Sequence, residues 1–230
     1  METEYGDVLE MNEKEIAFII CTNDEEQYAD CIYYINRLTV PKDYTIDVIC
    51  IKEAEGICEA YNAGMQASDA KYKIYMHQDV LIINPHFLED MISTFIRNPK
   101  AGMLGMIGRK DFDNKDKLFM NRYYGSIYET RVSKTVVYNN YSEEGKDEKV
   151  LHLDGLLIMT SVDIKWREDI LKEWDCYDVS QSLEMDRKGY EIYIPYMKEP
   201  WVLHDCGALN LEKYGRQRDI ILDEYAEYMG

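Results

Sequence analysis

The chain has 230 residues, which is enough for one sizeable hydrophobic core. Hydrophobic residues make up 46% of the sequence, and this composition excludes an intrinsically disordered protein. The net charge of −18 argues against binding to nucleic acids and to anionic membrane surfaces.

The first half of the chain alternates between strand and helix patterns. Strands are predicted at residues 16–21, 46–51, 72–76 and 101–108, and amphipathic helices at residues 28–38, 57–65 and 87–96. This order predicts an α/β fold with a mostly parallel central sheet and helices on both faces. Ligands of such sheets bind beyond the carboxyl ends of the strands, where Asn23, Lys52-Glu53 and His77-Gln78-Asp79 fall.

The pattern changes at Arg109. Residues 109–149 are polar and rich in tyrosine, with a hairpin or loose strands predicted near 127–138, and we interpret them as a functional insertion or acceptor-side region. Further strands are predicted at 151–160 (interrupted at Asp154-Gly155), 190–194 and 201–204, and helices at 164–174, 178–188 and 211–229. We expect one domain over residues 1–230 that closes with a C-terminal helix within residues 208–230.

Two features predict a cytoplasmic location. The six cysteines are scattered without a Cys-x-x-Cys pair, and Cys21 and Cys50 lie in apolar runs typical of reduced core thiols. The acidic first 15 residues carry no signal-peptide pattern, and no apolar run is long enough to span a membrane.

The triplet His77-Gln78-Asp79 separates two apolar runs, and burying three polar side chains there is costly unless something binds them. Because strand side chains alternate, His77 and Asp79 are expected to face one side, with Gln78 turned away. We hypothesise that His77 and Asp79 bind a divalent ion and, through it, a phosphorylated substrate. The alternative is a strand-end turn with solvated polar residues.

Two later residues are further candidates. His204 follows the apolar residues 201–203 and is either a third ligand of an ion such as Mn²⁺ or a core histidine bonded to backbone. Asp178, with Gln181 three residues later, fits a helix N-cap and equally a general base. Dinucleotide-binding, phosphate-loop and serine-nucleophile motifs are absent from the sequence.

Together these stretches resemble the glycosyltransferase family 2-like group with the GT-A fold, in particular the subgroup with His-Gln-Asp in place of the Asp-x-Asp metal motif. The matching stretches are residues 18–23, 60–64, 72–85, 153–160, 177–195 and 204. The sequence departs from the family pattern at Tyr61, at Lys52-Glu53 and at Tyr177, where the family often has glutamate.

The resemblance implies a role for each of eleven residues. These are Asn23, Glu53, Asn62, Gln78 and Asp79 for the donor; Asp154, Gly155 and Tyr177 for the sugar or the acceptor; Asp79, His77 and His204 for a metal, Mn²⁺ or Mg²⁺; and Asp178 as general base.

The activity that the resemblance implies is that of a metal-dependent inverting glycosyltransferase, which moves a sugar from a nucleotide-diphosphate donor to an acceptor hydroxyl. The acceptor (a glycan, a lipid-linked or a small molecule) and the oligomeric state, including a homo-oligomer, stay open. One alternative is a GT-A-like protein that binds a nucleotide sugar or a partner without transfer. The other is a sugar nucleotidyltransferase, which usually has a glycine-rich basic loop where this chain has the acidic residues 22–26.

Overall fold

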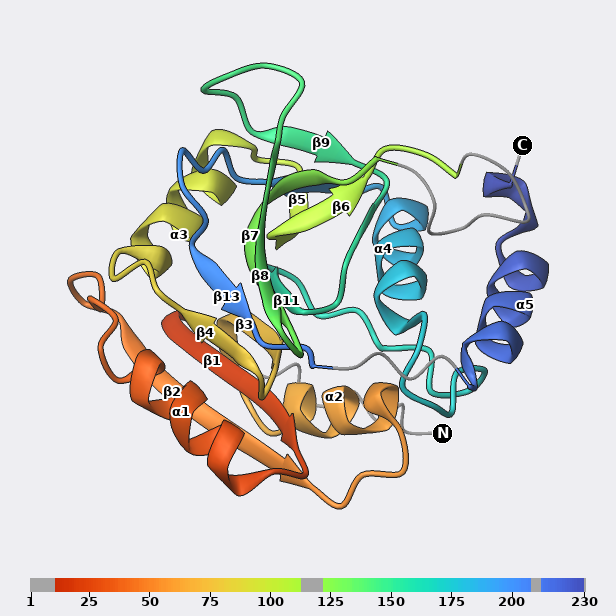
Figure 1. Ribbon diagram of the computed structural model, residues 1–230, viewed down its shortest axis with the longest axis horizontal. Coiled ribbons are helices and arrows are strands. Elements are labelled where there is room, and N and C mark those ends of the chain that lie inside the picture. The colour runs from red at the N-terminus through yellow and green to blue at the C-terminus, as the bar shows by residue number, and fades with distance from the viewer. Residues whose placement is uncertain (1–10, 113–121, 208–211, 230) are drawn as a thin grey trace, which may run out of the picture.

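The computed structural model describes residues 11–112, 122–207 and 212–229 (Figure 1). In chain order its elements are β1 (Asn12–Thr22), α1 (Glu25–Ile35), β2 (Thr45–Lys52), α2 (Ile57–Gln66), β3 (Ala70–His77), β4 (Val80–Ile82), α3 (Phe87–Arg97), β5 (Ala101–Gly105), β6 (Ile107–Arg109), β7 (Tyr124–Arg131), β8 (Lys134–Asn140), β9 (Glu148–Val150), β10 (His152–Leu153), β11 (Leu157–Thr160), α4 (Tyr177–Arg187), β12 (Glu191–Ile194), β13 (Val202–His204), α5 (Tyr214–Glu224) and the 3₁₀ helix η1 (Ala226–Tyr228).

A seven-stranded sheet forms the centre of the molecule, in the order β2-β1-β3-β11-β5-β12-β9. The strands β2, β1, β3, β5 and β12 run in one direction, and β11 and β9 run in the other. Figure 1 places α1 and α3 on one side of this sheet and α2 and α4 on the other. The predicted α/β fold with a mostly parallel central sheet is therefore confirmed.

A second sheet, which the sequence did not predict, has the order β10-β6-β7-β13-β4, with β8 paired to β7. The predicted hairpin in residues 127–138 is its β7–β8 pair. The predicted strand at 101–108 is divided between the two sheets, because β5 belongs to the first and β6 to the second. The predicted strand at 151–160 is divided in the same way, into β10 and β11.

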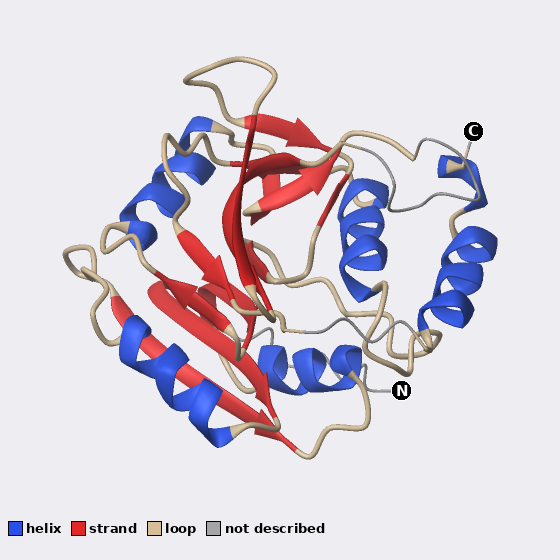
Figure 2. Cartoon of the chain, viewed as in Figure 1, coloured by secondary structure: helices blue, strands red, loops and turns tan. Residues whose placement is uncertain are grey.

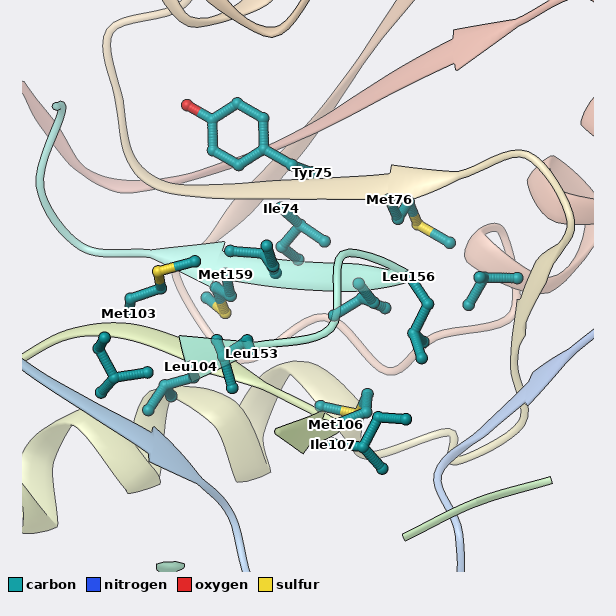
Figure 3. Close-up of a cluster of buried hydrophobic side chains, with 14 of the residues drawn as sticks. Ile74, Tyr75, Met76, Met103, Leu104, Met106, Ile107, Leu153, Leu156 and Met159 are labelled. Atoms are coloured by element: carbon teal, nitrogen blue, oxygen red, sulfur yellow. The ribbon is translucent and has the colours of Figure 1, made fainter. Parts of the chain in front are cut away.

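The hydrophobic core is continuous between the two sheets. Figure 3 shows its centre, where Ile74 of β3 lies near Met159 of β11, the strand that pairs with β3 on one side and on the other with β5, which carries Leu104. Helix α2 approaches β1 closely because it carries Gly64, whose Cβ, if present, would lie 2.3 Å from a methyl group of Ile19. The start of α2 also lies near the carboxyl ends of the first strands, because Ile57 lines the same pocket as Thr22 and His77.

Three local predictions were wrong. Residues 164–174 do not form a helix but a loop, drawn in tan before α4 in Figure 2. Asn84 was expected as the N-cap of a helix with Pro85 in its first turn, but the two residues form a turn before α3, whose N-cap is His86. Helix α4 begins at Tyr177 with Cys176 as N-cap, so Asp178 lies inside its first turn, and Gln181 donates a hydrogen bond to the Ile164 carbonyl rather than completing a capping box.

The C-terminal helix is confirmed, and it packs against α4. Tyr225 is fully buried, and its hydroxyl bonds Ser180 at 2.6 Å and Glu184 at 3.0 Å. Arg167 and Arg187 both form ion pairs with Glu184 and with Glu224 of α5. In the described part of the chain, no helix is long and apolar enough to cross a membrane.

Candidate active site

Three parallel strands end at one pocket. The register pairs Cys21 with His77 and Thr22 with Lys52, so the loops after β1, β2 and β3 lie side by side. They border a pocket of about 450 Å³, as expected for the carboxyl ends of parallel strands. Six of the predicted site residues line it, namely Asn23, Glu53, His77, Gln78, Asp79 and Tyr177.

Gln78 connects the loops after β1 and β3. Its side-chain carbonyl accepts hydrogen bonds from the backbone N–H groups of Asn23 and Asp24, each at 3.0 Å. Its amide nitrogen donates to the Asn23 side-chain oxygen at 2.8 Å. Because a backbone N–H can only donate, these contacts fix the orientation of the amide. Gln78 is thus directed toward the end of β1 and holds the loop that carries Asn23.

Glu53 begins the loop after β2 in a left-handed conformation, with φ of 58°, which is uncommon for a residue other than glycine. Its neighbour Lys52 forms an ion pair with Glu25 of α1 at 2.5 Å. Lys52 is therefore directed toward α1, and Glu53 lies on the pocket wall.

Asn62, which was predicted to contact the donor, does not line the pocket. It is 2% exposed, and its side-chain amide donates to the Trp166 carbonyl and to the Glu168 carboxylate, both at 2.9 Å. Its oxygen accepts from the Trp166 N–H, also at 2.9 Å. Asn62 therefore links α2 by hydrogen bonds to the loop between β11 and α4.

His77, Asp79 and His204 form a group with metal-binding chemistry, in which ligand atoms from all three residues lie within 4.8 Å of one another. Asp79 Oδ1 is 3.9 Å from His77 Nδ1 and 3.6 Å from His204 Nε2. Donor atoms about 2.1 Å from one ion lie roughly 3.0–3.5 Å apart, so small side-chain rotations would suffice for joint binding. Asp79 Oδ1 is buried and has no hydrogen-bond partner among the described residues, which fits a metal ligand.

The pairing of β13 with β4 brings His204 to this group, because it places His204 opposite Val80. Burial lowers the pKa of His77 and of His204 below the usual value, which keeps both imidazoles neutral and able to bind a metal near neutral pH. Burial also raises the pKa of Asp79, while the nearby His204 opposes this rise. The group therefore carries little positive charge of its own.

A second set of ligand atoms shares His204 and adds Glu129 and Cys206. The Glu129 carboxylate is already paired with the Arg131 guanidinium, and the Cys206 thiol donates to the Thr130 carbonyl at 3.6 Å. Because these groups have partners, the set of His77, Asp79 and His204 is the better candidate for a metal site.

Asp178 lies next to the pocket at the start of α4. Its carboxylate accepts hydrogen bonds from the N–H groups of Gly155 at 2.9 Å and Val179 at 2.8 Å. Burial, and next the negative charge of Asp154, raise the pKa of Asp178 to about 7, and the hydrogen bonds oppose this rise. A carboxylate with a pKa near neutrality can serve as a general base.

Asp154 and Gly155 form the turn between β10 and β11, as their position in the sequence predicted. The Asp154 carboxylate accepts from the Leu156 N–H at 3.2 Å and contacts the Tyr123 hydroxyl at 3.5 Å. The Gly155 carbonyl accepts a hydrogen bond from the Tyr177 hydroxyl at 3.1 Å. The predicted sugar-side residues are thus adjacent to one another.

The sequence reasoning missed Trp174, which lines the pocket with a side chain that is 47% exposed. Trp174 was overlooked because a helix was wrongly predicted at 164–174, and an apolar side chain at the end of an amphipathic helix is expected to face the core. Its position in a polar stretch just before Tyr177-Asp178 was the signal that could have identified it.

The sequence matches a family model described as "Glycosyltransferase like family" over residues 17–225. This protein therefore belongs to the glycosyltransferase-like family, which confirms the predicted family, while the subgroup with His-Gln-Asp stays a prediction.

Solved structures of S. aureus TarS have a similar fold. One aligns with 93% of this chain at 12% identity with a TM-score of 0.55, and this chain covers 40% of it. The 1–349 fragment in complex with UDP aligns with 93% of this chain at 12% identity with a TM-score of 0.52, and 66% of the fragment is covered. The chain thus spans less than two thirds of these proteins, and the likeness confirms the GT-A-like fold. No curated protein matches the sequence.

Proposed function

We propose that the protein is a glycosyltransferase that moves a sugar from a nucleotide-diphosphate donor to an acceptor hydroxyl with inversion of configuration. The observation that carries this proposal is the group of His77 Nδ1, Asp79 Oδ1 and His204 Nε2 beside the pocket at the strand ends. Family membership and the UDP bound to a TarS fragment of similar fold support a nucleotide-sugar donor.

The charge of the pocket supports metal dependence. None of the described residues that line it is a lysine or an arginine. A diphosphate bound there would lack a side-chain cation to neutralise it, and would meet the acidic Glu53 and Asp79. His77, Asp79 and His204 would hold Mn²⁺ or Mg²⁺, which when bound supplies positive charge to the leaving diphosphate.

The loops after β1 and β2 would hold the nucleotide. Gln78 keeps Asn23 in place through hydrogen bonds at 2.8 and 3.0 Å, and the left-handed backbone at Glu53 sets the opposite wall. We place the nucleoside between these two loops, away from Asp154 and Asp178. The sugar would then lie on their side, between the diphosphate and the acceptor.

Asp178 would act as general base. It would take the proton of an acceptor hydroxyl as the acceptor oxygen forms a bond to the anomeric carbon. The bond from that carbon to the diphosphate oxygen breaks at the same time, and its electron pair leaves with the nucleoside diphosphate. A single displacement of this kind inverts the anomeric configuration through an oxocarbenium-like state. Residues 109–149 remain our candidate for the acceptor side.

The test is Asp178→Asn, which should abolish transfer while Mn²⁺-dependent binding of nucleoside diphosphates persists in a thermal-shift assay. Binding at a hundredfold excess over Kd adds about 2.7 kcal/mol to the free energy of unfolding, so the shift is easily measured. The matched control is Asp186→Asn on the exposed side of the same helix, where the carboxylate bonds only Tyr228 among the contacts observed. This control should keep wild-type transfer.

Three outcomes would contradict parts of the proposal. Transfer by Asp178→Asn would remove Asp178 as the base. Binding without transfer or donor hydrolysis in the wild type would indicate a nucleotide-sugar-binding protein instead. Absence of metal-dependent stabilisation by any nucleoside diphosphate would overturn the donor and the metal together.

A further inference from the structure

Tyr177 is buried at the start of α4 with its hydroxyl between two polar groups. It donates a hydrogen bond to the Gly155 carbonyl at 3.1 Å and also contacts His77 Nε2. The Tyr177 ring packs against those of Tyr61 and Trp166, with centroid distances of 5.8 and 6.0 Å, and these two rings also contact each other at 5.0 Å. Tyr177 is 4% exposed, so its hydroxyl is engaged inside the protein.

The direction of these two hydrogen bonds follows from the number of protons that the Tyr177 hydroxyl can donate. A tyrosine hydroxyl has one proton, and a carbonyl can only accept, so that proton points to Gly155. Toward His77 the hydroxyl oxygen must then be the acceptor, which requires a proton on Nε2. A neutral imidazole has one ring proton, and its other nitrogen, Nδ1, therefore presents a lone pair. Nδ1 is the atom that lies 3.9 Å from Asp79 Oδ1.

We propose that Tyr177 is a positioning residue for the metal site, which holds His77 in the tautomer that directs an unprotonated Nδ1 toward Asp79 and His204. This inference rests on the proposed function of those three residues as metal ligands. Groups that hydrogen-bond the far nitrogen of a metal-binding histidine fix its ring and tautomer, and their loss typically weakens metal binding roughly 10- to 100-fold. Tyr177 would thus serve the metal rather than the sugar.

Gly155 is needed for this arrangement. A Cβ at position 155 would lie 2.1 Å from the Tyr177 hydroxyl oxygen, a distance that neighbouring atoms cannot share. Gly155→Ala would therefore displace the hydroxyl without deleting it. It offers a second way to break the contact with His77, independent of any change at Tyr177.

The first experiment reads the tautomer directly in the metal-free protein. Nitrogen-15 NMR of histidine-labelled full chain at about pH 8 distinguishes Nδ1–H from Nε2–H imidazoles. The chain has only four histidines, so a spectrum of His77→Ala suffices to assign His77. We expect the Nε2–H form in the wild type and a mixture of tautomers in Tyr177→Phe and in Gly155→Ala.

The second experiment measures the Kd of Mn²⁺ alone by calorimetry. Tyr177→Phe should weaken binding tenfold or more. The matched control is Tyr61→Phe, which removes the hydroxyl of an equally buried tyrosine whose ring contacts Tyr177 but whose hydroxyl has no hydrogen-bond partner among the described residues. This control should keep the wild-type Mn²⁺ affinity.

The inference is overturned if wild-type His77 carries its proton on Nδ1, or if Tyr177→Phe changes neither the His77 spectrum nor the Mn²⁺ affinity. A failure of the proposed function looks different. In that case the wild type would not bind Mn²⁺, while the His77 spectrum of the metal-free protein would still decide whether Tyr177 sets the tautomer.

Discussion

Asp178 is subject to opposing effects at close range. Burial and the neighbouring Asp154 disfavour its ionised form, whereas the N–H groups of Gly155 and Val179 favour that form. The balance raises the pKa of Asp178 to about 7. Near pH 7 a substantial fraction of Asp178 is therefore ionised and can accept a proton, and its pKa is high enough for the proton to remain bound.

The pH dependence of transfer should reflect this pKa. At saturating Mn²⁺, kcat/KM should rise about tenfold per unit below pH 7 and level off above it, because only the ionised carboxylate accepts a proton. Initial rates between about pH 5 and pH 9 would test this. A flat profile would contradict the assignment.

Stability gives a separate check on Asp178. Its folded pKa of about 7 exceeds the value of 3.8 for a free aspartate, so between these pH values the folded state holds a proton that the unfolded state has lost. The free energy of unfolding must then fall as pH rises through this range. Asp178→Asn removes the effect, and it should therefore be more favourable to stability, relative to wild type, at pH 8 than at pH 5.

The sequence indicated the residues whose position follows from local pattern. His77 and Asp79 alternate at a strand end, and the pairing of neighbouring strand ends brought Asn23 and Glu53 to the same pocket. The partners of Tyr177 and Asn62 could not be predicted in this way. Their hydrogen bonds reach residues 100 and 104 positions away in the chain, and no local periodicity encodes such contacts.

At the scale of elements, the loop between β11 and α4 depends on α2. Asn62 of α2 satisfies both the N–H and the carbonyl of Trp166, a residue that is 1% exposed. Gly56, at the start of α2, lies so close to the same loop that a Cβ there would be 2.4 Å from the Lys172 carbonyl oxygen. The loop carries Trp174 to the pocket, and α2 therefore positions it.

Asn62→Ala should lower the free energy of unfolding by about 2 kcal/mol, because it leaves the buried N–H of Trp166 unpaired and removes the hydrogen bonds to the Trp166 carbonyl and the Glu168 carboxylate. Chemical denaturation would measure this loss. The control Gln66→Ala, at an exposed position of the same helix, should change stability by less than about 0.5 kcal/mol. If Asn62→Ala instead keeps full stability and weakens only nucleotide binding, the original expectation of a direct donor contact is correct.

Element length explains which parts of the fold could be predicted. Strands β1, β2 and β3 have 8 to 11 residues and contain apolar runs, and all three were predicted. The second sheet includes β4, β6 and β13, each of three residues, which is too short for a recognisable period. Residues 164–174 have apolar spacing typical of a helix, but tertiary hydrogen bonds such as those of Asn62 decide their course.

At the scale of the whole molecule, the net charge of −18 opposes the approach of an anionic donor. The association rate of a nucleoside diphosphate at saturating Mn²⁺ should therefore rise when salt is increased from about 10 to about 150 mM, since screening weakens the repulsion. Stopped-flow tryptophan fluorescence can follow the reaction. A rate that falls with salt would mean that a basic surface outside the described pocket guides the donor.

The position of His204 has a consequence for the connectivity of the chain. Asp79 and His204 are more than a hundred residues apart in the sequence, yet β4 and β13 pair next to them, and the Asp205 N–H donates to the Asp79 carbonyl at 2.9 Å. An ion shared by the two side chains would close a loop of that length, and it would act as a reversible cross-link comparable in its entropic effect to a disulfide. Metal supply would then govern how firmly β13 is joined to β4, and a chelator would open this cross-link by removing the ion.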